Sequence, residues 1–212
     1  MAATGDWRGA CSRPGVPNYE VIGDVSRTLE AFLTAQLGVL PGPPIAQLHD
    51  LASPPGSSPP LLTLFLYDIV EDGSARNAPA VRTPIQVGGH QRVTSAKPRM
   101  ALVLRYMLTA WANDRVSEHR MIGRAIQSLY DHAALSGPQL LGTLASTPEA
   151  LKLTLSPISL EDRARVWDAI DQPYRLSVNY EVRVVHIDPE LSETTPGVTE
   201  QVVQPARVEV VG

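Results

Sequence analysis

The 212-residue chain contains a single cysteine, Cys11. One cysteine cannot close a disulfide bond within the chain or supply a four-cysteine metal site, and no base lies near it in the sequence to activate the thiol. The chain also lacks any run of about 18 apolar residues, and its N-terminus lacks the unbroken apolar core of a secretory signal. These absences predict a protein that is cytoplasmic when made and that has no membrane partner.

The chain also lacks an excess of positive charge. Lys and Arg number 18 against 22 Asp and Glu, so the formal net charge is -4. A nucleic-acid-binding protein normally gathers Lys and Arg on one face, and we therefore expect no nucleic-acid partner. The balance of 43% hydrophobic and 19% charged residues is typical of a globular protein, and the length fits one domain. We predict a flexible leader at 1–17, a single α+β domain at 18–188 and an extended arm or edge strand at 189–212.

Residue patterns for catalysis, metal binding and cofactor binding are missing as well. The sequence has no G-x-S-x-G elbow, and its histidines form no His-x-x-x-His or His-Glu-x-x-His pair. Gly88-Gly89-His90 lacks the lysine and the downstream hydroxyl of a phosphate-binding loop. We therefore predict no catalytic residue, no metal, no cofactor and no enzyme activity. An enzyme would have to combine His186, Asp188 and Ser177, but we interpret His186 as a structural histidine.

Hydrophobic periodicity predicts two long helices. The first runs from Tyr19 to about Leu37 behind Asn18 as the N-cap, and the second runs from Arg115 to about Ala134 behind Asn113 or Asp114. The predicted apolar stripes are Ile22, Val25, Leu29, Phe32 and Leu33 in the first helix, and Val116, Ile122, Ile126, Leu129 and Ala133 in the second.

Three segments have the pattern of strands. Leu61–Val70 is apolar at nearly every position, which favours a strand in the centre of a sheet, and Leu151–Leu155 alternates as a short strand. Arg99–Ala112 fits a second long strand, although its Ala, Leu and Met residues also fit a helix.

The remaining segments read as loops or extended chain. Seven prolines between Pro41 and Pro60 predict a surface loop, and Glu71–Pro98 predicts a loop in which one apolar patch adds an edge strand. Pro189–Gly197 predicts a polar loop. Gln201–Val211 predicts an edge strand or extended arm.

The segment from Ser156 to Asp188 predicts a short helix followed by a long strand. Ser159 is the expected N-cap, with Glu161 and Asp162 explained by the first helical turn rather than by acid–base chemistry. A stripe of Leu160, Ala164, Trp167 and Ile170 places Trp167 in the core. Pro173 ends the helix, and apolar residues then alternate with polar ones from Tyr174 to Val184. The sum is an α+β fold in which two or three helices pack on a mostly antiparallel sheet.

The same segment resembles a known family. Leu160-Glu161 up to Val166-Trp167, followed by Pro173-Tyr174-Arg175-Leu176-Ser177-Val178-Asn179-Tyr180-Glu181-Val182, is similar to the core of the cap, or tail-terminator, proteins of phage-tail-like contractile injection systems. The expected helix near the N-terminus, the two long strands and the helix after residue 113 occur in the order that this family shows.

The resemblance implies a homo-hexameric ring that closes the distal end of the inner tube and the sheath, fixes their length and performs no catalysis. Its partners are then the tube and sheath proteins, and we expect the Gln201–Val211 segment to pair with a sheath strand by edge addition. The predicted interface residues are Arg105, Trp111, Val202, Val203, Val208 and Val210. For Trp111, core and interface are equally supported. The alternatives are a non-enzymatic adaptor or ligand-binding domain, and an enzyme whose residues meet only in the fold.

Overall fold

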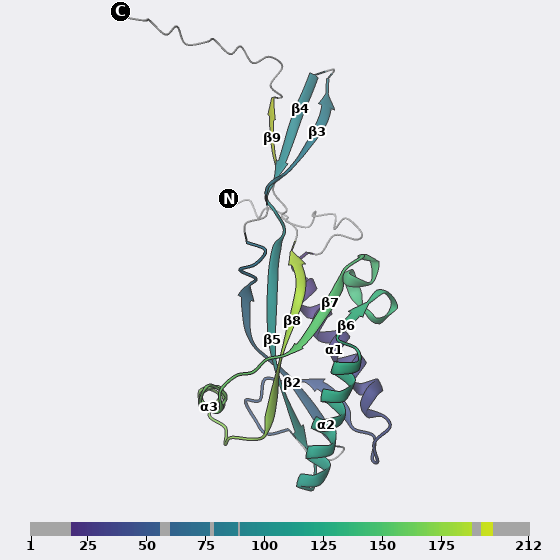
Figure 1. The fold of residues 1–212 in the computed structure, drawn as a ribbon, viewed down its shortest axis with the longest axis vertical. Helices are drawn as coiled ribbons and strands as arrows, with labels where there is room; N and C mark the ends of the chain where they lie inside the picture. Colours follow the sequence, from purple (N-terminus) through teal and green to yellow (C-terminus); the bar gives the residue numbers. More distant parts are fainter. Residues whose placement is uncertain (1–17, 56–59, 77–78, 89, 188–191, 197–212) are drawn as a thin grey trace, which may run out of the picture. The chain divides into compact units, whose positions relative to one another are not determined.

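The computed structural model describes residues 18–55, 60–76, 79–88, 90–187 and 192–196, and the chain divides into two compact units. The first unit contains residues 1–77 and 99–188, and the second contains residues 78–98 and 189–212. Figure 1 shows the helices and strands of both units in chain order.

The first unit is built on a six-stranded sheet with the order β1-β2-β5-β8-β7-β6. Apart from the parallel pair of β1 and β2, neighbouring strands are antiparallel. Its strands are β1 Ile45–Leu48, β2 Leu61–Glu71, β5 Met100–Trp111, β6 Ala134–Ser136, β7 Ala150–Leu155 and β8 Ser177–Ile187. Its helices are α1 Val21–Leu37, α2 Arg115–Asp131 and α3 Leu160–Ala169, with short 3₁₀ turns at Gly137–Gln139 and Gly142–Ser146.

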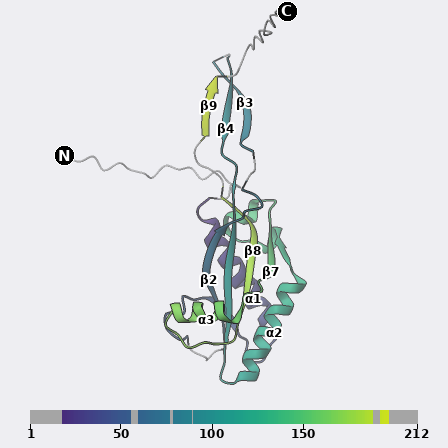
Figure 2. The same cartoon turned by 60° about the vertical axis from the view of Figure 1, so that its left-hand side comes forward.

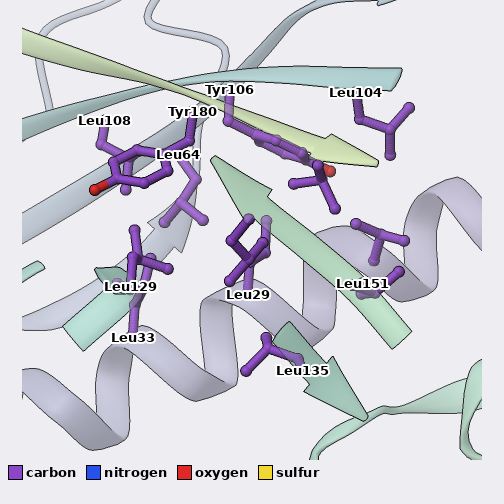
Figure 3. Close-up of a cluster of buried hydrophobic side chains, with 14 of the residues drawn as sticks. Leu29, Leu33, Leu64, Leu104, Tyr106, Leu108, Leu129, Leu135, Leu151 and Tyr180 are labelled. Carbon is purple, nitrogen blue, oxygen red and sulfur yellow. The ribbon is translucent and has the colours of Figure 1, made fainter. Parts of the chain in front are cut away.

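The two faces of this sheet are covered by different helices. Figures 1 and 2 show α1 and α2 on one face and α3 on the other. Between the sheet and the first two helices lies the main hydrophobic cluster, in which Leu29 and Leu33 of α1 meet Tyr106 and Tyr180 of the sheet (Figure 3). A smaller cluster lies under α3, where Trp167 packs with Met107 and Trp111 of β5.

The second unit is a three-stranded antiparallel sheet with the order β3-β4-β9. Its strands are β3 Val81–Val87, β4 His90–Ala96 and β9 Ser192–Pro196. Where burial is described in β3 and β4, no side chain is buried. The structure therefore shows no apolar core among the described side chains of this sheet.

The mostly antiparallel α+β fold expected from the sequence is confirmed. The predicted long strands correspond to β2, β5 and β8, and the predicted helices to α1, α2 and α3. The side chain of Asp114 caps α2 by accepting from the Ser117 amide, and the side chain of Ser159 caps α3 by accepting from the Asp162 amide. Local cap chemistry therefore places the start of both helices correctly.

Two predicted element starts and two predicted stripe positions were wrong. Asn18 does not cap α1: its Oδ1 accepts from the Glu20 amide at 2.9 Å in a turn, and the helix begins at Val21. Val116 and Leu160 were predicted in the apolar stripes but are exposed, and each lies in the first turn of its helix. The strand predicted from Tyr174 begins only at Ser177.

Three predicted loops contain strands. The segment Pro41–Pro60 holds β1, which pairs in parallel with β2 from Ile45 onward. The segment Glu71–Pro98 forms the hairpin of β3 and β4, which belongs to the second sheet and adds no edge strand to the first. The segment Pro189–Gly197 holds β9. Each of these strands pairs with a partner strand in the structure, whereas the prolines and glycines around them predicted loops. The predicted strand Gln201–Val211 lies outside the described residues.

Candidate interaction site

Arg105, a predicted interface residue, lies in the middle of β5 on the sheet face that α3 partly covers. The strand register places Asp68 of β2 and Glu181 of β8 opposite it. The Arg105 guanidinium donates to Asp68 Oδ2 at 2.8 Å and to Glu181 Oε1 at 3.2 Å. Three strands are therefore joined by one row of charges across the sheet.

The electrostatics of this row follow from its ion pairs. Hydrogen bonds from the Arg183 side chain, and then from Arg105, hold the pKa of the Glu181 carboxyl below its ordinary value. Partial burial acts to lower the pKa of Arg105, but the pairs with Asp68 and Glu181 outweigh it and raise that pKa. The ion pairs of Arg105 with Asp68 and Glu181 set opposite charges against one another along the row. The row is therefore better suited to fixing strand register than to binding a free ion.

Trp111, the second predicted interface residue, lies at the end of β5 and is only 6% exposed. Its indole Nε1 donates to Thr63 Oγ1 at 3.1 Å, and the guanidinium of Arg175 lies 4.1 Å from the ring centroid. Arg175 in turn pairs with the nearly buried carboxylate of Glu118, which also accepts from Arg115 at 2.8 Å. Trp111 therefore packs as a core residue with one edge toward the surface.

A hollow of about 390 Å³ opens beside this cluster. It is lined by Pro54, Pro55, Trp111, Ala112, Asn113, Asp114, Arg115, Glu118 and Arg175. Both arginines in the lining are paired with Glu118. With Asp114, which also lines the hollow, the two positive and two negative side chains have a formal net charge of zero. Arg105 lies six positions from Trp111 along β5, about 20 Å by strand geometry. These two predicted interface residues therefore do not form one patch.

The other predicted site residues are placed as follows. The predicted interface residues Val202, Val203, Val208 and Val210 lie outside the described residues, as does Asp188. Ser177 is buried and accepts from Trp167 Nε1 at 3.3 Å, while His186 Nδ1 lies 3.1 Å from Glu149 Oε1. His186 is therefore a bonded structural histidine, as expected. Ser177 and His186 lie at opposite ends of β8, about 30 Å apart by strand geometry, so they do not form a catalytic pair.

In the part of the chain that the structure describes, no group of three or more His, Cys, Asp or Glu side chains is suited to holding a metal ion. No helix in that part of the chain is long and apolar enough to cross a membrane.

The sequence reasoning missed Glu118 and Arg175, which position Trp111. A buried glutamate in the first turn of a helix has an ordinary capping explanation, and Arg175 follows a proline in an irregular segment. Only the fold brings them together across 57 positions. Asp68 and Glu181 could have been suspected from the sequence, because each is an acidic residue inside a segment whose other residues predict a strand.

Comparison with known proteins identifies the family. Residues 24–201 match the Pvc16 N-terminal domain family, and since this range covers most of the chain, the chain belongs to that family. No curated protein matches the chain.

Two solved structures share the fold. The sheath/tube terminator of an extracellular contractile injection system, PVC, in its extended state has a TM-score of 0.57 and 21% identity over 89% of this chain. The tube-terminating cap of the anti-feeding prophage has a TM-score of 0.53 and 18% identity over 88% of this chain. The chain spans 65% and 60% of the length of these two proteins. The resemblance seen in the sequence is thereby confirmed at the level of family and fold.

Proposed function

We propose that this chain is a structural cap that closes the distal end of the inner tube and sheath of a contractile injection particle and fixes its length. It acts as a homo-hexameric ring assembled in the cytoplasm, it contacts the tube and sheath proteins, and it performs no catalysis. The observation that carries the proposal is the shared fold with a sheath/tube terminator over 89% of the chain, together with membership of the family.

The surface of the first unit supports an assembly role. Large apolar side chains are exposed on several separate elements, among them Tyr130 on α2, which is 82% exposed, and Leu160 on α3. Tyr174 and Leu176 add exposed apolar area just before β8. A chain that meets a neighbouring copy, a tube and a sheath needs several such surfaces, whereas a ligand-binding domain needs one concave site.

The test is particle assembly from purified or co-expressed tube, sheath and this chain. With the chain present, we expect tubes of uniform length whose ends carry six-fold density in negative-stain images. Without it, tube length should be broadly distributed and the ends bare. Uniform lengths in its absence, or bare ends in its presence, would contradict the proposed function.

The C-terminal segment gives a second test of the sheath contact. Deleting residues 199–212 removes the segment expected to pair with a sheath strand and keeps every described residue. We expect sheath protein to be lost from capped tubes in a pull-down through the cap. Unchanged recovery of sheath would exclude this segment as the contact.

A further inference from the structure

The helix α2 carries a stripe of exposed residues on the side that does not pack on the sheet. Val116 is 58% exposed and Tyr130 is 82% exposed, so two large apolar side chains of this stripe contribute little to the core. A partner that covers them gains the burial that the chain itself does not provide. The stripe follows helical spacings of four and three positions, and we define it as the outer face of α2: Val116, Arg120, Gly123, Gln127 and Tyr130.

Gly123 lies at the centre of this face and leaves a gap in it. Val116 and Tyr130 are each seven positions away, which is about 10 Å along the helix axis. A Cβ added at Gly123 would meet no atom within 4 Å, and the backbone there is not in the left-handed region. Glycine inside a helix is less favourable than alanine, and neither the backbone nor the described neighbours of Gly123 require it. A close approach by another backbone is the contact for which a glycine is needed.

The helix α3 presents a surface of opposite charge. It is fixed to the sheet through Trp167, which is the one buried residue of this helix. The exposed residues on the side away from Trp167 contain three acidic groups and one basic group, a formal charge of -2, whereas Arg120 gives the outer face of α2 a formal charge of +1. The two surfaces are therefore complementary. We define the outer face of α3 as Glu161, Asp162, Arg165, Asp168 and Ala169.

Arg120 and Asp168 are the charged groups of these two faces that remain available to a partner. On α3, Arg165 pairs with Glu161 at 2.6 Å, and Asp162 accepts from the N-cap hydroxyl of the same helix at 2.7 Å. Arg120 and Asp168 are both exposed, and neither has a side-chain hydrogen bond or an ion pair to another described residue. An arginine on one face and an aspartate on the other are thus free to pair between chains.

The two outer faces lie on opposite sides of the first sheet, since Figures 1 and 2 show α2 on one side and α3 on the other. Contact between α2 of one copy and α3 of another is therefore heterologous: it uses a different surface of each copy and leaves one of each free to continue in the same direction. Such contacts can close a ring. Two α2 faces in contact would instead set Arg120 against Arg120 and stop at a dimer.

We propose that the outer face of α3 of one copy binds the outer face of α2 of the next, with α3 crossing at Gly123 and Asp168 paired with Arg120. This assignment rests on the proposed cap function, because the ring in that proposal supplies the second copy. A helix is about 10 Å across, so α3 fits between Val116 and Tyr130, which lie about 21 Å apart along α2. Their apolar side chains then pack against the two flanks of α3.

The first test reverses one charge on each face of the full chain. Arg120→Asp and Asp168→Arg, each alone, should lower the fraction of hexamer in sedimentation at least about tenfold, because like charges then meet at every contact. Both substitutions in one chain should restore the ring, as should an equal mixture of the two single variants, in which they alternate. Where the unmodified chain forms rings only on tubes, the fraction of tube ends with six-fold density gives the same comparison.

Gly123→Leu tests the close approach, and Gly23→Leu is its matched control. Gly23 is likewise an exposed helix glycine at which an added Cβ meets no atom within 4 Å, but it lies on α1. Both variants should unfold at a urea concentration no lower than that of the unmodified chain, because leucine favours a helix more than glycine does. Only Gly123→Leu should lose the ring; equal ring formation by the two variants would overturn the crossing at Gly123.

Crosslinking tests whether unlike faces meet. A chain with Cys11→Ser, Gln127→Cys and Ala169→Cys carries one thiol on each outer face, and a short bismaleimide should join its copies into a ladder that ends at the hexamer. In the Cys11→Ser background, either new cysteine alone should give no crosslinked product. A dimer from Gln127→Cys alone would show that α2 meets α2 and would overturn the assignment.

The charge variants also separate this inference from the cap function. Rings that both single variants keep, or that the combined variant does not restore, overturn the contact of α2 with α3, while uniform capped tubes leave the cap function standing. Loss of the ring by Arg120→Asp with no effect of Asp168→Arg assigns α2 to another partner and overturns the pairing as well. An unmodified chain that forms no ring, in solution or on tubes, overturns both.

Discussion

Among the described glycines, Gly142 is the one at which an added methyl group should lower the free energy of unfolding most. Its φ is +62°, and a Cβ added there would lie 2.1 Å from Oδ1 of Asp24. Asp24 is a buried carboxylate of α1, only 5% exposed, whose Oδ2 accepts from the Thr143 amide at 2.8 Å and from Thr143 Oγ1 at 2.7 Å. These bonds attach the turn at Gly142–Ser146 to the first helix, so the methyl group cannot be accommodated without moving a charged, bonded group.

The expected cost of Gly142→Ala has two parts. A non-glycine residue at positive φ costs about 1 kcal/mol. Displacing Asp24 weakens two charge-assisted hydrogen bonds and leaves a buried carboxylate short of partners, which adds about 3 kcal/mol. The free energy of unfolding should therefore fall by about 4 kcal/mol, measured by urea denaturation. Tryptophan fluorescence is a suitable probe because Trp111 and Trp167 both lie in the first unit.

The chain offers a matched control at Gly137. Its φ is +57°, but a Cβ there meets no atom within 4 Å. Gly137→Ala should cost only the conformational part, about 1 kcal/mol. In an Asp24→Ala background Gly142→Ala should also cost about 1 kcal/mol, because the carboxylate that it displaces is gone, which gives a coupling of about 3 kcal/mol. Equal costs for the two glycine substitutions would refute the reasoning.

Three further outcomes follow from the core, a helix cap and a buried tyrosine. Trp167→Ala should lower the free energy of unfolding by about 4 kcal/mol in a urea titration followed by circular dichroism, since the indole is 1% exposed and bonded to Ser177; a loss under about 1 kcal/mol would contradict its core role. Asp114→Ala should cost about 1 kcal/mol in the same assay, because the Ser117 amide loses its acceptor, and Asp114→Asn should restore most of it. Burial raises the pKa of Tyr106 to about 12, so its stabilising effect is complete below the unfolded pKa of about 10 and is lost as the pH rises toward 12. Tyr106→Phe should flatten that alkaline loss of stability, and an equally steep loss in the variant would exclude Tyr106 as its main source.

The elements that were predicted correctly are those stabilised by residues close to them in the sequence. Asp114 and Ser159 cap their helices through amides three residues away, and the strand pattern of β5 is complete within one segment. The interior strands of the first sheet likewise carry their own apolar faces. For these elements a short window of sequence contains the forces that stabilise them.

The parts that were missed depend on residues far away in the chain. The β1 strand is short, lies among prolines, and is held by β2 on one side and by Thr34 and Glu30 on the other. The β9 strand pairs with β4 across about a hundred positions. Of the candidate site, Arg105 and Trp111 were chosen from the sequence, but their partners Glu181 and Arg175 became evident only once strand register and the path of the chain were known.

The second sheet differs from the first in what its sequence pattern reflects. β3 alternates in sequence, V-R-T-P-I-Q-V, but none of the described side chains of β3 and β4 is buried. A three-stranded sheet whose described side chains form no core gains little stability from their burial. Each hydrogen bond and contact added by a partner is then a large fraction of what holds the sheet together. A partner that contacts this sheet should for this reason protect the amides of β4 and β9 from hydrogen exchange, whereas a partner that bound the first unit alone would leave them unchanged.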